Sequence, residues 1–213
     1  MKFKEAVTYD DMLIVPQYSD IESRKEVDIG SNLGHRELRL PIIASPMDTV
    51  SGVDMAIAMY RAGGLAVLHR YNTIEEQRRM AREVIDHTEW SGNVAAAIGV
   101  TGNYLQRAES LVAVGVDILC VDVAHGHHSL MKKALTTLRE AFDNHIYIMA
   151  GNVCTLEGIN DLADWGADAV RCNIGGGSIC STRIVTGHGL PGLQTIFDCA
   201  RTDRDVKIIA DGG

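Results

Sequence analysis

The sequence predicts an α/β fold, a (β/α)8 TIM barrel of which about seven of the eight strands lie within these 213 residues. Short apolar runs rich in Val, Ile and Ala recur along the chain, and continuous rather than alternating apolar runs indicate parallel strands covered on both faces. Polar stretches with helical periodicity separate the runs, as in a repeated βα unit. Polar side chains gather at the carboxyl ends of the runs. A barrel carries its active site there, whereas an open sheet has its site at one switch point.

The predicted elements alternate along the chain. The strands are expected at 40–47, 65–70, 94–100, 118–124, 146–152, 169–175 and 207–213, and helices at 76–85, 105–114, 129–142 and 156–165. The first of these helices has the clearest start, because Thr73 and Glu76 have the spacing of a capping box. Gly115 and Gly166 each stand just before a strand, where glycine commonly ends a helix because it tolerates positive φ.

Composition excludes several classes of function. Hydrophobic residues make up 46% and charged residues 23%, as in an ordinary globular enzyme. The net charge of −8, with no long basic run, argues against a nucleic-acid partner. We expect no membrane partner either, because no stretch approaches the length of a membrane span and the N-terminus lacks the apolar region of a signal peptide. A reduced, cytoplasmic protein is expected, since the five cysteines form no CxxC pair.

One segment, 173–183, combines a glycine-rich loop with a cysteine. The glycines at 175–177 let the backbone approach an anion closely and point N–H groups at it. Cys180 follows this loop, beside Thr182 and Arg183, and a nearby cation with backbone donors favours the nucleophilic thiolate. From spacing alone, a nucleophile and an inert cysteine in a glycine-rich turn remain equally open. The other four cysteines are expected to be structural.

This segment, Gly-x-Gly-Ser-Ile-Cys-x-Thr-Arg, resembles the active-site loop of the IMP dehydrogenase / GMP reductase family. Four further motifs match in family order: SPMDTVS (45–51), AHGHH (124–128), AGNV (150–153) and ADGG (210–213). The stretch TYDDMLIVP (8–16) is similar to the N-terminal lead-in of the family. The resemblance therefore covers essentially the whole chain.

The resemblance implies a role for each site residue. Cys180 would attack C2 of a purine nucleotide, the carbon where hydride is exchanged with a nicotinamide cofactor, and Thr182 would assist proton transfer there. The residues implied to bind the nucleotide are Ser45, Met47, Ser178, Asp211, Gly212 and Gly213. The residues implied to face the cofactor are Asp122, Val123, Ala124, Asn152, Arg171, Asn173 and Gly175. Backbone carbonyls of Gly175, Gly177 and Cys180 would hold a monovalent cation such as potassium.

The resemblance also sets expectations for organisation. Residues 1–213 are expected to form a single barrel domain from which the C-terminal part of the barrel and a mobile flap are missing. The regulatory CBS modules that many family members carry after the second strand are absent, because one helix leads directly from HRYNTIEEQ to VAAAIGV. A homotetramer or larger assembly is implied. Where the family usually has glycine, this chain has Asn173, whose side chain is expected to lie where backbone would meet the cofactor.

Two reactions and one non-catalytic role remain open. An NAD-dependent IMP dehydrogenase, which converts IMP to XMP, is favoured by SPMDTVS (45–51), MAIAMYRAGG (55–64) and TIEEQ (73–77). A GMP reductase, which uses NADPH to convert GMP to IMP with release of ammonia, is favoured by the missing modules, by YSDIESRKEVD (18–28) and by Thr186-Gly187. The residues that would decide lie beyond Gly213. An unclosed barrel would leave a strand edge uncovered, so a non-catalytic nucleotide-binding fragment is the third hypothesis.

Other polar residues have simpler explanations. His125, His127 and His128 could suggest a metal site, since an HxH pair can place two imidazoles together. No further cluster with ligand spacing accompanies them, so a transition metal is not expected. Asp48 follows the first strand, and we expect it to cap the next helix.

Overall fold

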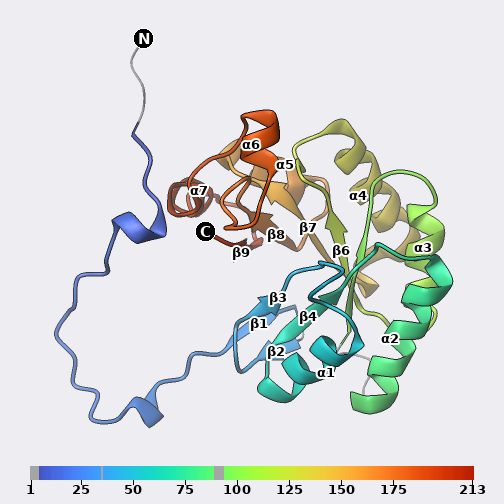
Figure 1. Ribbon diagram of the computed structural model, residues 1–213, viewed down its shortest axis with the longest axis horizontal. Helices are drawn as coiled ribbons and strands as arrows, with labels where there is room; N and C mark the ends of the chain where they lie inside the picture. The colour runs from blue at the N-terminus through green and yellow to red at the C-terminus, as the bar shows by residue number, and fades with distance from the viewer. Residues whose placement is uncertain (1–4, 35, 89–93) are drawn as a thin grey trace.

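The computed structural model describes residues 5–34, 36–88 and 94–213, and it contains the predicted barrel sheet. Seven strands form one sheet in chain order, and each pairs with its neighbour in parallel. They are β3 (Ile43–Ala44), β4 (Leu65–Leu68), β5 (Ala95–Ile98), β6 (Ile118–Asp122), β7 (Tyr147–Val153), β8 (Ala169–Cys172) and β9 (Lys207–Ala210). The sheet curves, and helices cover its outer side (Figure 1). The α/β barrel prediction is confirmed.

Each predicted helix is present, and three more appear. The helices are α1 (Val53–Ala62), α2 (Ile74–Thr88), α3 (Tyr104–Val112), α4 (Ser129–Phe142), α5 (Leu156–Asp164), α6 (Thr182–Thr186) and α7 (Gly192–Cys199). The capping box forms as expected, with the Thr73 amide donating to Glu76 at 2.9 Å and the Glu76 amide donating to Thr73 Oγ1 at 3.2 Å. Gly115 and Gly166 follow α3 and α5 with φ of 103° and 111°, which confirms their role at the helix ends.

Alternate residues of each strand enter two separate cores, and this explains the continuous apolar runs. On β6, Leu119 and Val121 pack outward against the helices, while Ile118 and Cys120 point into the inner core. The amino end of that inner core is covered by a hairpin of β1 (Ser31–Leu33) and β2 (Arg36–Leu38). Because both faces of the sheet are buried, both carry mainly apolar side chains along the strands.

Most of the strands leave the sheet earlier than predicted at their carboxyl ends. Strand β3 covers only two residues of the expected 40–47, β8 ends at Cys172 and β9 ends at Ala210. Beyond β8 and β9 the backbone takes conformations that a strand cannot hold, with φ of 80° at Gly175 and 69° at Gly212. The residues lost from the ladder form the loops of the candidate site.

The expectation that Asp48 caps the next helix is wrong. Helix α1 begins at Val53, its N-cap is Gly52, and no side chain caps it. The chain first makes a tight turn in which the amides of Val50 and Ser51 donate to the carbonyl of Met47. This turn separates the exposed Asp48 from the helix by four residues.

The N-terminal segment, residues 5–29, runs outside the sheet with two short 3-10 turns, η1 (Tyr9–Asp11) and η2 (Arg24–Glu26) (Figure 1). A third, η4 (Asp143–His145), follows α4. The segment meets the barrel where the Gln194 amide of α7 donates to Val7 O at 3.3 Å. Over the described ranges, no helix is both long enough and apolar enough to cross a membrane.

The capping box gives a stability prediction. Replacing Thr73 with alanine removes the hydroxyl that accepts from the Glu76 amide, so the free energy of unfolding should fall by about 1 kcal/mol in a urea titration. The matched control is Thr136→Ala, at an exposed position inside α4, where alanine is the better helix former. That variant should be no less stable than the parent. Equal losses in the two variants would show that the cap contributes nothing.

Candidate active site

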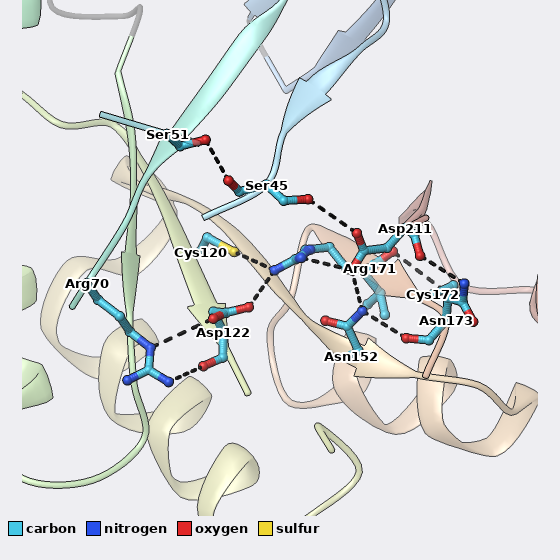
Figure 2. Close-up of polar contacts among 11 residues, drawn as sticks. Ser45, Ser51, Arg70, Cys120, Asp122, Asn152, Arg171, Cys172, Asn173 and Asp211 are labelled. Carbon is cyan, nitrogen blue, oxygen red and sulfur yellow. Dashed lines mark hydrogen bonds and ion pairs between the residues drawn. The ribbon is translucent and has the colours of Figure 1, made fainter. Parts of the chain in front are cut away.

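Arg171 of β8 joins three strand ends at the carboxyl side of the sheet. Its side chain is 9% exposed. Nη1 donates to Asp122 Oδ1 at the end of β6 at 2.6 Å, and Nη2 donates to Asp211 Oδ2 just after β9 at 2.8 Å (Figure 2). One guanidinium therefore fixes the positions of two carboxylates that are 89 residues apart, at 122 and 211.

The surroundings of Arg171 keep it charged although it is buried. Burial alone would lower the pKa of the guanidinium, but the attraction of Cys120, Asp211 and Asp122 more than offsets this and raises the pKa above its ordinary value. Burial also raises the pKa of the Cys120 thiol to about 12, so the sulfur is neutral at physiological pH. The two carboxylates are therefore the charges that balance Arg171 near neutrality.

A β-bulge directs Asn152 into the same network. Gly151 pairs with Arg171 and Val153 pairs with Cys172, so Asn152 is the extra residue between them. Its side-chain amide donates to Asp211 Oδ2 and, at 2.8 Å, to the carbonyl of Asn173 (Figure 2). Glycine is required beside it, because a β-carbon at Gly151 would lie 2.7 Å from Arg171 Cβ. The Oδ2 atom of Asp211 thus has two donors within the protein.

The other oxygen of Asp211 is only weakly engaged. Ser45, which follows β3, donates to Asp211 Oδ1 at 3.4 Å, and the buried Ser51 donates to the carbonyl of Ser45 (Figure 2). Since Oδ1 has this single long bond among the described residues, it can accept a hydrogen bond from a ligand hydroxyl. Sequence reasoning did not single out Ser51, and its spacing from Ser45 gave no signal.

Asn173, whose side chain is expected to lie where backbone would meet the cofactor, is a buried residue at the start of the glycine-rich segment. Its side chain is turned into the protein, the residue is 3% exposed, and Nδ2 donates to the carbonyl of Asp211 at 2.9 Å. A β-carbon at Gly176 would lie 2.3 Å from Nδ2, so the glycine loop packs directly on this side chain. The backbone has φ of 153° at Asn173, and the side chain lies beneath the glycine loop. Any contact of residue 173 with a cofactor must therefore come from its backbone.

Cys180 lies on the partly exposed loop between β8 and α6. Its amide donates to the carbonyl of Gly177 at 3.0 Å, which closes a tight turn. A β-carbon at Gly212 would lie 3.3 Å from Gly177 Cα, so this turn touches the loop that follows Asp211. The cysteine loop and the Asp211 loop, distant in sequence, thus form one surface.

The environment of Cys180 favours the thiolate. Hydrogen bonds from the side chain and backbone of Thr182 lower the pKa of the thiol, burial opposes them weakly, and Gly175 and Arg183 add to the lowering. The half-buried Cys154 differs, because burial and then the neighbouring Cys199 raise its pKa. Of these two partly accessible thiols, Cys180 is the one whose surroundings favour the thiolate, the nucleophilic form.

The remaining predicted residues lie around this network. Ala124 and Ser178 are exposed, Met47 and Val123 are half-buried, and the Val123 amide donates to the carbonyl of Gly151 at 3.0 Å. Gly213 lies against the ring of Tyr9, since a β-carbon there would come within 2.5 Å of it. A cavity of about 310 Å³ opens beside the network, with Ser45, Arg171 and Asp211 in its wall. This volume lies at the lower end of the range of small-molecule sites.

The histidine motif has structural partners. His127 Nε2 lies 2.8 Å from Asp161 Oδ2, and its ring packs near Trp165. His128 Nδ1 accepts from the Leu130 amide at 3.1 Å and so caps α4. In the parts of the chain that the structure describes, no three His, Cys, Asp or Glu side chains come together as metal ligands.

Several known proteins are similar to this chain in sequence and in fold. A model of the IMP dehydrogenase / GMP reductase domain matches residues 6–213. The inosine-5′-monophosphate dehydrogenase of Nitrosopumilus maritimus is 28% identical, over 100% of this chain and 71% of its own length. The crystal structure of the corresponding enzyme from Legionella pneumophila matches with TM-score 0.89 and 45% identity, over 98% of this chain and 62% of its own. The GMP reductase of Trypanosoma brucei, in complex with guanosine 5′-triphosphate, matches with TM-score 0.89 and 28% identity, over 99% and 81%.

Arg171 should contribute strongly to stability. Arg171→Met leaves two carboxylates without their buried partner, so the free energy of unfolding should fall by about 3 to 5 kcal/mol in a denaturant titration. The double variant Arg171→Met/Asp122→Asn should recover part of this loss. Arg78→Met, at an exposed pair with Glu75, is the control and should change stability by less than about 0.5 kcal/mol. A loss for Arg171→Met no larger than the control's would contradict the assigned role.

The lowered pKa of Cys180 predicts its reactivity. The rate of alkylation by iodoacetamide, followed by mass spectrometry of the Cys180 peptide, should reach half its maximum below pH 9.0, the ordinary thiol value. Thr182→Val removes the hydroxyl donor and should move the midpoint to higher pH. The Cys154 peptide of the same sample is the control, and its midpoint should lie above 9.0. An unchanged midpoint in Thr182→Val would refute the role of Thr182.

Proposed function

Since the chain belongs to the IMP dehydrogenase / GMP reductase family, whose members are NAD(P)-dependent oxidoreductases of purine nucleotides, we propose that it is an IMP dehydrogenase. The reaction takes IMP, NAD and water to XMP and NADH. The observation that carries the proposal is Cys180, a thiol with a lowered pKa on a partly exposed loop that touches the Asp211 loop. The 45% identity with the Legionella dehydrogenase favours this reaction within the family.

A covalent bond to Cys180 would divide the reaction into two steps, an oxidation at C2 and a hydrolysis. The Cys180 thiolate would add to C2 of IMP, and a bound nicotinamide would supply the two-electron acceptor for the hydride on that carbon. Water then replaces the sulfur at C2, which releases XMP and restores the thiol. Thr182, whose hydroxyl and backbone lower the pKa of this thiol, would move a proton there as the thiol is restored.

The network around Arg171 suits the nucleotide. Asp211 presents Oδ1 to the ribose hydroxyls, since its other oxygen is occupied by Arg171 and Asn152. Exposed Ser178 and the backbone of Gly212 and Gly213 suit the phosphate, and Met47 suits the base.

The residues proposed for the cofactor and for the cation are chosen by the chemical groups that they offer. Asp122, Val123, Ala124 and the backbone from 173 to 175 would border the nicotinamide. The carbonyls of Gly175, Gly177 and Cys180 are neutral oxygens, as a potassium ion requires. The Gly177 carbonyl already accepts from the Cys180 amide, but a carbonyl oxygen has a second lone pair.

A GMP reductase is the second candidate, supported by the match of 99% of this chain to the Trypanosoma structure. It would use NADPH at the same carbon and release ammonia. We further propose that the protein works in the cytoplasm as a homotetramer or larger. The five free cysteines fit a reducing compartment.

Absorbance at 340 nm tests the proposal. The protein should raise the absorbance with IMP and NAD, and it should leave GMP with NADPH unchanged. A fall in the second mixture would identify a reductase instead. No change in either, with nucleotide binding still detected by calorimetry, would favour the non-catalytic hypothesis.

Cys180→Ala should abolish turnover while IMP binding stays within about threefold, because the thiol acts on C2 and the phosphate and ribose contacts remain. Cys154→Ala is the matched control and should keep the parent rate. Retained turnover in Cys180→Ala would rule out covalent catalysis by this residue.

A further inference from the structure

The N-terminal segment is fixed to the barrel at the short turn η1, which lies beside α7 (Figure 1). The Asp11 carboxylate accepts one hydrogen bond from the Thr8 amide at 2.8 Å and another from the Thr8 hydroxyl at 3.0 Å, so the turn is closed by its own residues. Just before the turn, the Val7 carbonyl accepts from the Gln194 amide of α7 at 3.3 Å. Tyr9, the first residue of η1, is therefore carried by a closed turn that is attached to the barrel.

The ring of Tyr9 packs against the glycine at the end of the Asp211 loop. A β-carbon at Gly213 would lie 2.5 Å from Cε2 of the ring and 2.6 Å from Cδ2, and the three heavy atoms nearest to it, apart from its neighbours in the chain, all belong to Tyr9. A β-carbon at Gly192, the first residue of α7, would lie 3.0 Å from the same Cε2 and 3.5 Å from Gly213 Cα. The ring, the start of α7 and Gly213 therefore meet at one point, and the two glycines leave the space that the ring occupies.

The other two residues of the Asp211 loop are supported by other parts of the protein. The Asp211 carbonyl accepts from Asn173 Nδ2 at 2.9 Å. A β-carbon at Gly212 would lie 3.3 Å from Gly177 Cα, so this residue rests on the glycine-rich turn. Each residue of the loop thus has a separate support, and at its last residue that support is the Tyr9 ring.

Two consecutive glycines need such a support to keep one conformation. Gly212 and Gly213 have φ of 69° and 145°, a region of the backbone map that glycine enters freely. Glycine loses more conformational freedom on ordering than any other residue, so a ligand that had to order both glycines would bind more weakly. An aromatic ring offers a large contact area and has only two side-chain torsions to fix, so it orders the loop at a small entropic cost. The loop is then ordered before a ligand arrives.

The Tyr9 ring also adds no charge beside the loop. Burial, followed by the charge of Cys172, raises the pKa of the Tyr9 phenol above its ordinary value of 10.0. The hydroxyl therefore keeps its proton at neutral pH, and the ring places no negative charge next to backbone amides that would receive an anion.

We propose that Tyr9 is a positioning residue for the nucleotide: its ring holds the backbone of Gly212 and Gly213 in the conformation that receives the phosphate group. The inference rests on the proposed function, which assigns these two glycines to that group. It adds to the site a part of the chain that precedes the first strand of the sheet. The phosphate is remote from C2 of the base, so the ring contributes to binding and leaves the chemical step unchanged.

Protection of Cys180 by IMP is the test of nucleotide affinity. Alkylation of the full chain by iodoacetamide is followed by mass spectrometry of the Cys180 peptide while the concentration of IMP is varied. Tyr9→Ala should raise the half-protecting concentration of IMP at least about tenfold. The rate without IMP should stay within about twofold of the parent, because the groups that lower the pKa of the thiol lie on its own segment, 175–183.

Two matched variants separate the packing of the ring from other effects. Tyr9→Phe keeps the ring and removes only the hydroxyl, so its half-protecting concentration should return to within about twofold of the parent. Leu13→Ala removes a large apolar side chain from the same segment, where it is 93% exposed, and should behave as the parent. In turnover, Tyr9→Ala should raise the KM for IMP about tenfold and keep kcat within about twofold, as expected when an interaction made equally in the ground state and the transition state is lost.

Protection of equal strength in the parent and in Tyr9→Ala would overturn the role of Tyr9 and leave the proposed function standing. The same conclusion would follow from a Tyr9→Phe variant as weak as Tyr9→Ala. It would also follow if Cys180 of Tyr9→Ala reacted more than about twofold more slowly than in the parent without IMP, since the loss would then be a general structural one. If IMP fails to protect Cys180 in the parent, the proposed function falls and this inference falls with it.

Discussion

The candidate site depends on one buried guanidinium that holds two carboxylates. Arg171 is nearly inaccessible, and its bonds to Asp122 and Asp211 connect the ends of β6, β8 and β9. A buried charge is stable only when it is paired, so each of the three side chains determines the position of the other two. Asn152 and Ser45 then bond to Asp211, and Arg70 bonds to Asp122. The loops that follow these strands therefore start from positions that the Arg171 network holds.

The second constraint on the site is that the backbone passes very close to buried side chains at several glycines. Gly151 leaves space for Arg171, and Gly176 leaves space for the inward side chain of Asn173. The turn that closes on Cys180 rests on this packing, and Gly177 brings it against Gly212. A reactive thiol and an open carboxylate oxygen therefore occupy one surface without a rigid secondary-structure element between them. The lowered pKa of Cys180 comes from Thr182 and Arg183 on the same loop, so this part of its chemistry is local.

Sequence patterns predicted the elements better than their ends. The capping box at Thr73 and the helix-ending glycines at 115 and 166 could be predicted, because each depends only on residues a few positions away in the sequence. Strands β3, β8 and β9 are shorter than predicted, because the residues after the last ladder pair enter loops whose course depends on distant partners. The prediction that Asp48 caps the next helix was wrong because the chain turns after Met47, before helix α1 begins. A local pattern does not show that the chain turns four residues before the helix begins.

The sequence by itself determined the α/β barrel architecture, the family to which the chain belongs and the loop that carries Cys180, since these follow from periodicity and from motifs of adjacent residues. Only the tertiary structure decided that Arg171 lies between Asp122 and Asp211 and that Asn173 turns inward. These contacts join residues 38 to 49 positions apart, at strand ends that the sheet register brings together. No local pattern encodes them, because their geometry exists only once the parallel strands have paired.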